Sequence, residues 1–390
     1  MTDSCGLCRS PNLESIYKPQ GSGRGLTVYI CTHCGLVQSL PRIDNAPRRE
    51  AAVSSGADWG NVRYGKGFRT EACLAMIKAH TDLRGRLSVL DVGSNRGSFA
   101  RALLTVAPQA ELTCVEPDER VASACANLEG VTLINARIED TRLPSASFDI
   151  VYSCHTLEHL ASPAFVMADH WRVLKAGGLL IVDVPNIALT GSEDVLEEWF
   201  IDKHLFHFSK TTLMRLLDAS GFETVGEPDP NDRENLLFAA RKWAVAARPV
   251  KRDSKEVDAG LALLSTYLVN RSRNLAVLED VATEISSLAP ERVALWGAGR
   301  LFDALVLQGR FNPKLLTLLI DTHLKDHMAE RHGVALSGPD AIASADPGVI
   351  VVMSRAFSSE IAQAAAKAAP KAEIIFYADL LSRARTRLAA

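Results

Sequence analysis

Residues 87–99 read Leu87-Ser-Val-Leu-Asp-Val-Gly-Ser-Asn-Arg-Gly-Ser-Phe99, and this stretch decides the fold class. Its apolar residues predict a buried strand that ends at Asp91, followed by a glycine-rich turn and a helix that begins near Ser98. Strands of this kind end at the carboxyl edge of a parallel sheet, where open α/β folds bind ligands. Gly93 and Gly97 let the backbone turn sharply and approach a ligand closely. The spacing Asp-x-Gly-x-x-x-Gly differs from the Gly-x-Gly-x-x-Gly of dinucleotide sites.

Further strands follow at regular intervals. The strand over 111–115 runs into Glu116 and Pro117, so an acid stands 25 residues after Asp91. A carboxylate there can accept hydrogen bonds from both ribose hydroxyls of a nucleoside. A third strand over 131–135, a fourth over 147–154 and a Gly-Gly–strand unit over 174–185 complete the series. The order predicts an α/β domain that binds a nucleoside.

This series of motifs resembles the class I S-adenosylmethionine (SAM) methyltransferases. The resemblance implies a Rossmann-like core with SAM as cofactor and a residue after the third strand that faces the adenine amino group, for which Ile138 and Glu139 are the candidates. The predicted SAM-binding residues are Asp91, Gly93, Ser94, Asn95, Gly97, Glu116, Pro117, Ile138, Glu139, Ser153 and His155. The alternative is an α/β domain with another nucleoside ligand.

Four cysteines near the N-terminus form two Cys-x-x-Cys pairs. Cys5 and Cys8 are separated from Cys31 and Cys34 by 22 residues. Paired knuckles of this spacing are typical of a tetrahedral zinc site, and four thiolates leave no open coordination position. The sequence therefore predicts a structural zinc ion in an N-terminal ribbon, the alternative being four packing thiols without a metal.

Histidines follow the fourth and fifth strands. Methyl transfer needs an acceptor held in line with the methyl group and, for a weakly acidic acceptor, a base. Histidine suits this task because its ordinary pKa is near neutrality. We predict His204 as the general base, with His159 and His207 as further catalytic candidates. The alternatives are loop-ordering histidines, or a divalent cation held by His155, Glu158 and His159.

The C-terminal third has its own pattern. Apolar residues from Leu264 to Leu288 follow helical spacing and predict one long amphipathic helix. Arg292-Val-Ala-Leu-Trp-Gly-Ala-Gly-Arg300 then predicts a second strand, glycine turn and helix, in a smaller Rossmann-like unit. Its turn lacks the third glycine of a dinucleotide fingerprint, so we expect no NAD there. The unit is either a platform for substrate at a helix N-terminus, or a structural module or dimerisation element.

Together, the predicted parts divide the chain into four segments: a zinc-binding ribbon (1–45), a SAM-dependent methyltransferase domain (46–245), a linker with a long helix (246–289) and a Rossmann-like domain (290–390). This arrangement resembles the three-domain, zinc-containing sugar C-methyltransferases, which act on nucleotide-linked 4-keto deoxysugars. That family carries a Tyr-x-Glu-His signature, where this chain has Ile201-Asp-Lys-His204. Because only His204 matches, the resemblance implies a sugar or sugar-bearing acceptor but leaves C-, O- and N-methylation open.

Composition and charge help to choose among the remaining classes of function. The chain has 390 residues, 47% of them hydrophobic, and a net charge of −3. This acidic balance disfavours an RNA methyltransferase. Eight cysteines without a visible signal peptide or membrane span predict a cytoplasmic protein. We expect a small-molecule substrate, no nucleic-acid or membrane partner, and a monomer or homodimer. A small-molecule O- or N-methyltransferase of natural-product metabolism and a non-enzymatic SAM-binding scaffold remain alternatives.

Overall fold

The computed structural model describes residues 4–20, 22–42, 68–243, 248–326, 328–355 and 357–389. The predicted boundaries at residues 45 and 245 lie outside these ranges. The chain forms two compact units, the first made of residues 1–190 and 199–264, the second of residues 191–198 and 265–390. No helix among the described residues is both long enough and apolar enough to cross a bilayer.

A mixed seven-stranded sheet forms the centre of the first unit. Its order is β10-β11-β8-β7-β4-β5-β6, and β11 runs against the other six strands. The strands are β4 (Ser88–Val92), β5 (Glu111–Val115), β6 (Val131–Ile134), β7 (Phe148–Cys154), β8 (Leu174–Pro185), β10 (Phe222–Gly226) and β11 (Asn235–Lys242). The chain moves outward from β4 through β5 to β6 and then returns to β7 on the other side of β4. The carboxyl ends of β4 and β7 therefore form a topological switch point, where open α/β sheets bind ligands.

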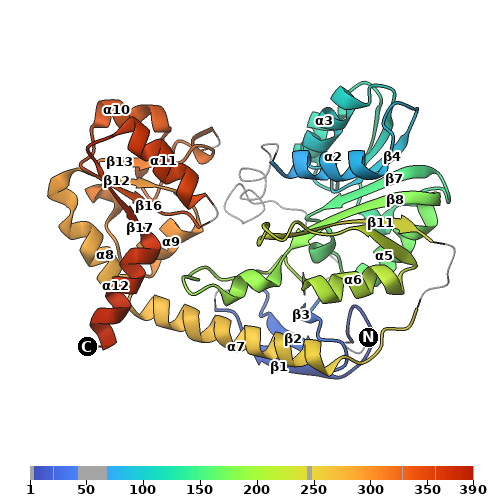
Figure 1. The fold of residues 1–390 in the computed structure, drawn as a ribbon, viewed down its shortest axis with the longest axis horizontal. Helices are drawn as coiled ribbons and strands as arrows, with labels where there is room; N and C mark the ends of the chain where they lie inside the picture. The colour runs from blue at the N-terminus through green and yellow to red at the C-terminus, as the bar shows by residue number, and fades with distance from the viewer. Residues whose placement is uncertain are drawn as a thin grey trace. The chain divides into compact units, whose positions relative to one another are not determined.

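Helices cover both faces of this sheet, as Figure 1 shows. On one face, α2 and α3 pack on side chains such as Val89, Ile150 and Ile181. On the other face, α5 and α6 pack on Val151 and Val182. Because both faces are buried, the central strands are mainly apolar. The helices of this unit are α2 (Phe68–His80), α3 (Ser98–Val106), α4 (Glu119–Ala126), α5 (Pro163–Val173) and α6 (Lys210–Ala219).

A second sheet belongs to the same unit. We call the N-terminal residues that form most of it, 4–42, the cysteine ribbon. It contains β1 (Leu13–Tyr17), β2 (Thr27–Cys31) and β3 (Val37–Leu40), and the short strand β9 (Phe206–His207) completes it by pairing with β3. Its cysteines share one apolar core with the strands of the seven-stranded sheet. The ribbon therefore packs as part of the first unit.

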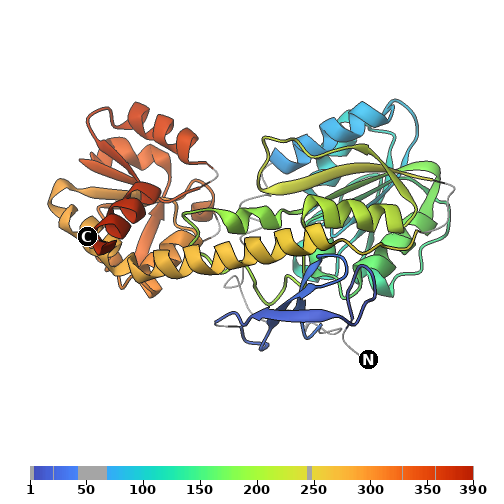
Figure 2. The ribbon, with the colours of Figure 1, turned by 60° about the horizontal axis from the view of Figure 1, so that its bottom comes forward.

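Helix α7 (Ser254–Ala276) starts on the cysteine ribbon, beside the blue strands in Figure 2. A Cβ atom at Gly35 would lie 2.5 Å from the Glu256 side chain, and one at Gly260 would lie 2.7 Å from Ile30. The two glycines permit this close packing. The single helix predicted through residues 264–288 is wrong at Val277, where α7 ends and α8 (Leu278–Ser287) begins.

The second unit is built on a six-stranded sheet of order β14-β15-β13-β12-β16-β17, in which β14 alone is antiparallel to its neighbour. Its strands are β12 (Val293–Trp296), β13 (Leu318–Ile320), β14 (Glu330–Arg331), β15 (Val334–Ser337), β16 (Val349–Val352) and β17 (Glu373–Phe376). Its helices besides α8 are α9 (Arg300–Leu307), α10 (Ile342–Ala345), α11 (Ser358–Ala368) and α12 (Tyr377–Ala389). The parallel strands bring Gly297, Arg355 and Tyr377 to the carboxyl edge of the sheet.

Candidate functional site

The turn after β4 has a backbone that glycine alone adopts easily. Gly93 and Gly97 have φ angles of +75° and +72°. A Cβ atom at Gly93 would lie 2.3 Å from the Thr156 hydroxyl oxygen, and one at Gly97 would lie 2.5 Å from the sulfur of Cys125. The turn therefore requires both glycines, which let it pack against Thr156 and Cys125 at the switch point.

Glu116 closes the other side of this turn. One of its carboxylate oxygens accepts a hydrogen bond from the Asn95 N–H (2.9 Å) and the other from the Asp118 N–H (3.0 Å). A carboxylate accepts several hydrogen bonds, so a group of this kind suits the hydroxyls of a ribose. Asp91 lies behind the turn in full burial, which raises the pKa of its carboxyl well above the ordinary value.

The other predicted SAM-binding residues lie at the same edge of the sheet. Ser94 and Asn95 form the turn, and Pro117 follows β5 beside Glu116. Ile138 is buried in a single 3₁₀ turn after β6, and Glu139 in that turn pairs with Arg137 at 2.8 Å. Ser153 is buried near the end of β7. The topology therefore brings these residues to the ends of four neighbouring strands, and their contacts with SAM stay a prediction.

A turn over residues 155–159 follows β7 and contacts the glycine turn. The Thr156 hydroxyl, which faces Gly93, donates to the Val92 carbonyl oxygen at 3.1 Å. His155 has a φ of +47°, in the left-handed region that few residues other than glycine adopt. Its Nδ1 atom lies 3.4 Å from Oε1 of Glu158. The strained turn thus places ionisable side chains next to the predicted cofactor.

Glu158 is the buried centre of this turn. Neither of its carboxylate oxygens has a hydrogen-bond partner among the described residues, and burial raises its pKa to about 8. At neutral pH the group is therefore mostly protonated and can donate a hydrogen bond. Its Oε1 atom lies 3.6 Å from Nε2 of His159.

His159 connects Glu158 to His204. Its Nδ1 atom lies 2.9 Å from the Lys203 carbonyl oxygen, which can only accept, so Nδ1 donates and Nε2 faces Glu158. The rings of His159 and His204 lie 4.8 Å apart. One ligating atom from each of Glu158, His159 and His204 falls within 4.8 Å of the others. The structure therefore brings together two of the three catalytic candidates.

Residues 201–208, which we call the catalytic segment, are held on both sides. On one side, the Leu205 N–H donates to the Glu158 carbonyl oxygen at 2.8 Å. On the other, the Ser39 N–H donates to the Leu205 carbonyl oxygen at 2.8 Å. Asp202 accepts hydrogen bonds from the Ser22 hydroxyl and, at 2.9 Å, from the Gly23 N–H. The cysteine ribbon thus fixes the backbone that carries His204.

His207 lies in a different environment from His204. Its ring is buried, its Nε2 atom lies 3.0 Å from the Ser39 hydroxyl, and Phe200 contacts it edge-on at 4.7 Å. Burial lowers its pKa to about 3, so the ring stays neutral. This geometry favours a packing role, and we leave His207 out of the proposed reaction.

Sequence reasoning missed Arg69 and Asp183. Arg69, on α2, is buried and lies 3.5 Å from the carboxylate of Asp183 near the end of β8. Asp183 in turn lies 3.8 Å from Nε2 of His155. Burial raises the pKa of Asp183 to about 6, although Arg69 opposes the shift. An acid inside the apolar run 179–184 was the available signal, but nothing local points to its partner on α2.

The four N-terminal cysteines converge. The sulfur atoms of Cys5 and Cys34, and those of Cys8 and Cys31, are each 3.5 Å apart, and all four lie within 4.8 Å of one another. Tetrahedral zinc with Zn–S bonds of about 2.3 Å separates its sulfur ligands by about 3.8 Å. Four soft donors at this spacing fit zinc. A metal at this site stays a prediction.

The second unit has its own glycine turn, over residues 297–299. Gly297 has a φ of +118°, and a Cβ atom there would lie 2.4 Å from the Met353 carbonyl oxygen. Asp321, at the end of β13, accepts from the N–H groups of Ala298, His323 and Leu324. In a dinucleotide site the acid at this position binds the ribose. Here Asp321 instead binds the backbone of the loops that follow β12 and β13.

A family profile described as a methyltransferase domain matches residues 90–182. The chain is 30% identical to a probable SAM-dependent methyltransferase of Mycolicibacterium smegmatis over 41% of its length and 66% of that protein. It is 30% identical to a trans-aconitate 2-methyltransferase of Acidovorax ebreus (36% of this chain, 55% of that protein). It is 27% identical to a ubiquinone biosynthesis O-methyltransferase of Roseobacter denitrificans (40% and 66%).

Among solved structures, a SAM-dependent methyltransferase from Mesorhizobium loti has a TM-score of 0.37 at 19% identity and covers 43% of this chain and 96% of its own. The 1,6-didemethyltoxoflavin-N1-methyltransferase of Burkholderia thailandensis has a TM-score of 0.37 at 17% identity, covering 59% and 99%. The chain spans between 35% and 66% of the length of the first curated relatives it matches.

Proposed function

We propose that the protein methylates a small-molecule acceptor from SAM with His204 as the general base. Residues 90–182 match a methyltransferase-domain profile, and a probable SAM-dependent methyltransferase is among the relatives. The contact of the 155–159 turn with the glycine turn carries this proposal. Thr156 lies against Gly93, and two residues further Glu158 begins the chain of side chains that ends at His204. The base therefore lies on the cofactor's side of the sheet, close to the predicted methyl donor.

Each group of residues has its own role in the proposed methyl transfer. Bound SAM supplies the methyl group and a sulfonium leaving group. The glycine turn and Glu116 hold the nucleoside end, because both lie at the carboxyl ends of neighbouring strands and a carboxylate there suits ribose hydroxyls. His204 takes the proton from the acceptor. His159, fixed by the Lys203 carbonyl oxygen and facing protonated Glu158, keeps the ring of His204 in place.

We propose a sugar, in particular a nucleotide-linked one, as the acceptor, on the strength of the resemblance described above. Transfer to oxygen fits the residues better than transfer to carbon. Asp202, the one acid close before His204, is held by the Ser22 hydroxyl and the Gly23 N–H of the ribbon. The tyrosine and glutamate of the sugar C-methyltransferases are absent, and a hydroxyl acceptor needs only one base.

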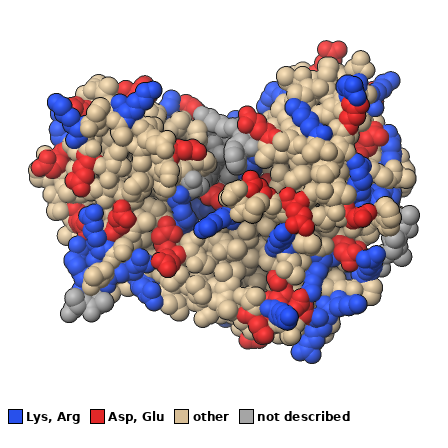
Figure 3. Space-filling model, viewed as in Figure 1, with Lys and Arg blue, Asp and Glu red and all other residues tan. Residues whose placement is uncertain are grey.

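A second candidate function is metal-assisted O- or N-methylation of another small molecule of natural-product metabolism. In place of the predicted set of His155, Glu158 and His159, the described residues that come close enough for one cation are Glu158, His159 and His204. One relative is a ubiquinone biosynthesis O-methyltransferase and another acts on trans-aconitate, so acceptors without a sugar need testing. On the face drawn in Figure 3, acidic and basic side chains alternate, which offers nucleic acid no continuous basic track there.

We also propose that the four cysteines bind a structural zinc ion. Thiolate ligands need reducing conditions, so the cytoplasm is the proposed compartment. The zinc would hold the ribbon against the catalytic segment and take no part in the reaction, because four thiolates leave no open position.

The experiment is a panel assay for S-adenosylhomocysteine release with nucleotide-linked sugars, small carboxylates and quinols as acceptors. Turnover with a nucleotide-linked sugar, and a product heavier by one methylene, supports the proposal. Turnover only with small carboxylates or only with quinols would show that the acceptor belongs to that class and not to the sugars. SAM binding without turnover for every acceptor favours the non-enzymatic scaffold. Adding Mg²⁺ or Mn²⁺ to protein stripped of weakly bound metal would raise turnover about tenfold or more if a cation acts, and leave it unchanged if His204 acts alone.

A further inference from the structure

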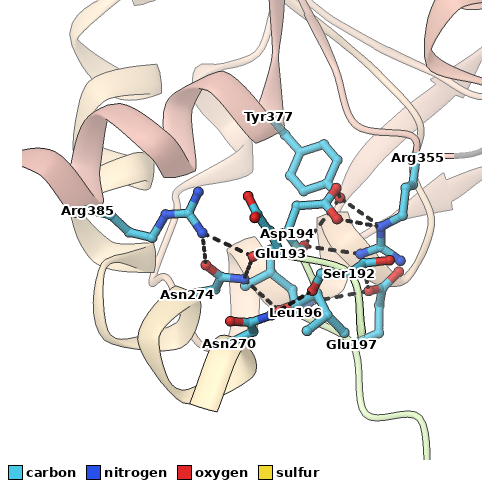
Figure 4. Close-up of polar contacts among 11 residues, drawn as sticks. Ser192, Glu193, Asp194, Leu196, Glu197, Asn270, Asn274, Arg355, Tyr377 and Arg385 are labelled. Atoms are coloured by element: carbon cyan, nitrogen blue, oxygen red, sulfur yellow. Dashed lines mark hydrogen bonds and ion pairs between the residues drawn. The ribbon is translucent and has the colours of Figure 1, made fainter. Parts of the chain in front are cut away.

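Residues 191–198, which we call the strap, leave the first unit after β8 and return just before the catalytic segment. They form part of the second unit, at the carboxyl edge of its sheet. This is the edge where open α/β sheets bind ligands. Here a segment of the same chain lies at that edge, as Figure 4 shows.

Side chains of the second unit bind the strap through its backbone. Six consecutive carbonyl oxygens, from Ser192 to Glu197, each accept a hydrogen bond from one of these side chains. In chain order the donors are Asn270 (3.3 Å), Asn274 (2.9 Å) with Arg385 (3.0 Å), Arg355 (3.1 Å) with Tyr377 (3.3 Å), Asn274 again (2.9 Å), Arg271 (3.0 Å) and Tyr267 (3.4 Å). After an initial 3₁₀ residue, Gly191, the strap has neither helix nor strand, so these side chains replace secondary structure in satisfying its backbone.

Two acids of the strap add charge-assisted contacts. The Arg355 guanidinium donates to the carboxylates of Asp194 (3.1 Å) and Glu197 (2.9 Å). The single Tyr377 O–H is shared between the Asp194 carbonyl oxygen and the Asp194 carboxylate, which is the nearer acceptor. Burial by itself would raise the pKa of Glu197, but Arg355 and Arg300 outweigh it and hold the pKa at about 2. The ion pairs therefore persist at every physiological pH.

Buried side chains also hold the strap in the second unit. Val195 and Leu196, between the two acids, are buried. Asn274 is fully buried and spans two carbonyl groups of the strap, directly before the break between α7 and α8. An ordinary surface loop has neither its side chains buried in this way nor its carbonyls bound one after another.

We propose that the second unit is a clamp for the strap, and that Arg355 and Tyr377 are positioning residues for methyl transfer. The strap ends six residues before His204, so fixing it limits where the catalytic segment and the acceptor can lie. The naming of His204 as the base rests on the proposed function, whereas the clamp itself does not. This assigns the second unit a task that requires no nucleotide.

The test compares Arg355→Met with Arg331→Met in the full chain. Arg331 pairs with Asp303 in the same unit and is about equally buried, so it is a matched control. Glu193, Glu197 and Glu198 offer cleavage sites for a glutamate-specific protease. Losing a hydrogen-bonded charge pair should speed cleavage in the strap about 10- to 100-fold in Arg355→Met, but not in Arg331→Met.

Turnover is measured on the same variants. We expect kcat to fall about tenfold in Arg355→Met with the Kd for SAM unchanged, and part of the loss to be recovered in Arg355→Lys. Unchanged cleavage overturns the clamp, and faster cleavage with unchanged kcat overturns the positioning role. If Arg355→Met does not fold, Tyr377→Phe removes one hydroxyl and tests the same contact. Normal turnover of His204→Asn would refute the proposed base and leave the cleavage result standing.

Discussion

His204 acquires its place from contacts that its own sequence neighbourhood does not reveal. The ring of His159 lies 4.8 Å away, and the N–H of the next residue, Leu205, bonds to Glu158. A histidine supported in this way can accept a proton without moving, which is the requirement for a general base.

Replacing His204 with Asn should lower kcat by about two to four orders of magnitude, because proton transfer from the acceptor loses its base. The Kd for SAM should not change, since the cofactor is expected on the glycine turn. Steady-state kinetics and calorimetry measure the two quantities. His332→Asn, in the second unit, is the control and should stay within about twofold of wild type. A small effect of His204→Asn would contradict the proposed role.

His170 on α5 provides a test of stability at the residue scale. It is fully buried, neither ring nitrogen has a hydrogen-bond partner among the described residues, and burial lowers its pKa to about 4. Since the unfolded chain binds the proton near pH 6.5 and the folded chain only near pH 4, the folded state loses stability as pH falls through this window. The stability is fully present above pH 6.5.

The variant His170→Leu should remove this loss. At pH 5 wild type should be weakened by about 2 kcal/mol relative to pH 7.5 through this residue alone, and the variant should not be. Urea unfolding at the two pH values measures the difference. An equal loss in wild type and variant would show that His170 does not cause it.

At the scale of elements, the turn between β4 and α3 is the feature that local sequence predicts best. A short apolar strand, two glycines at a fixed spacing and a helix start all lie within thirteen residues. Pattern and geometry agree there because each glycine is required by its own φ angle. The helix over 264–288 shows the opposite case: the apolar spacing continues through Val277, but the chain breaks there next to Asn274, whose side chain binds the strap.

Gly93→Ala should weaken SAM binding by about 10- to 100-fold. The new methyl group would collide with Thr156, and the positive φ adds strain of about 1 kcal/mol or more. Gly177→Ala is the control, because Gly177 has a φ of +70° but open space around its Cβ position. Calorimetric titration with SAM compares the variants. If both bind SAM as wild type does, the turn does not hold the cofactor.

At the scale of the whole first unit, the cysteine ribbon and the seven-stranded sheet share one core. Cys31 and Leu36 pack in the same cluster as Val182. The pairing of β3 with β9 also ties the ribbon to the catalytic segment. The unit should therefore respond to loss of the metal as one body.

Removing zinc with a chelator, or changing Cys31 to Ser, should lower the melting temperature by about 10 °C or more and also abolish turnover. Metal analysis of the purified protein should find about one zinc per chain, and the Cys31→Ser variant should lack it. Restoring zinc to the chelated wild type should restore both properties. Protein that contains no zinc and is indifferent to chelators would refute the site.

The sequence by itself determined the glycine turn, the order of strands around it and the pair of cysteine knuckles, because each signal lies within neighbouring residues and follows a period or a spacing. Only the tertiary structure decided that β9 joins the ribbon, that Arg69 meets Asp183 and that the second unit holds the strap. The side chains that bind the strap carbonyls lie 70 to 192 residues away along the chain. Every residue carries a backbone carbonyl oxygen, whatever its side chain. A segment held through its carbonyl groups therefore needs no particular sequence, and its sequence shows no pattern that would reveal the contact.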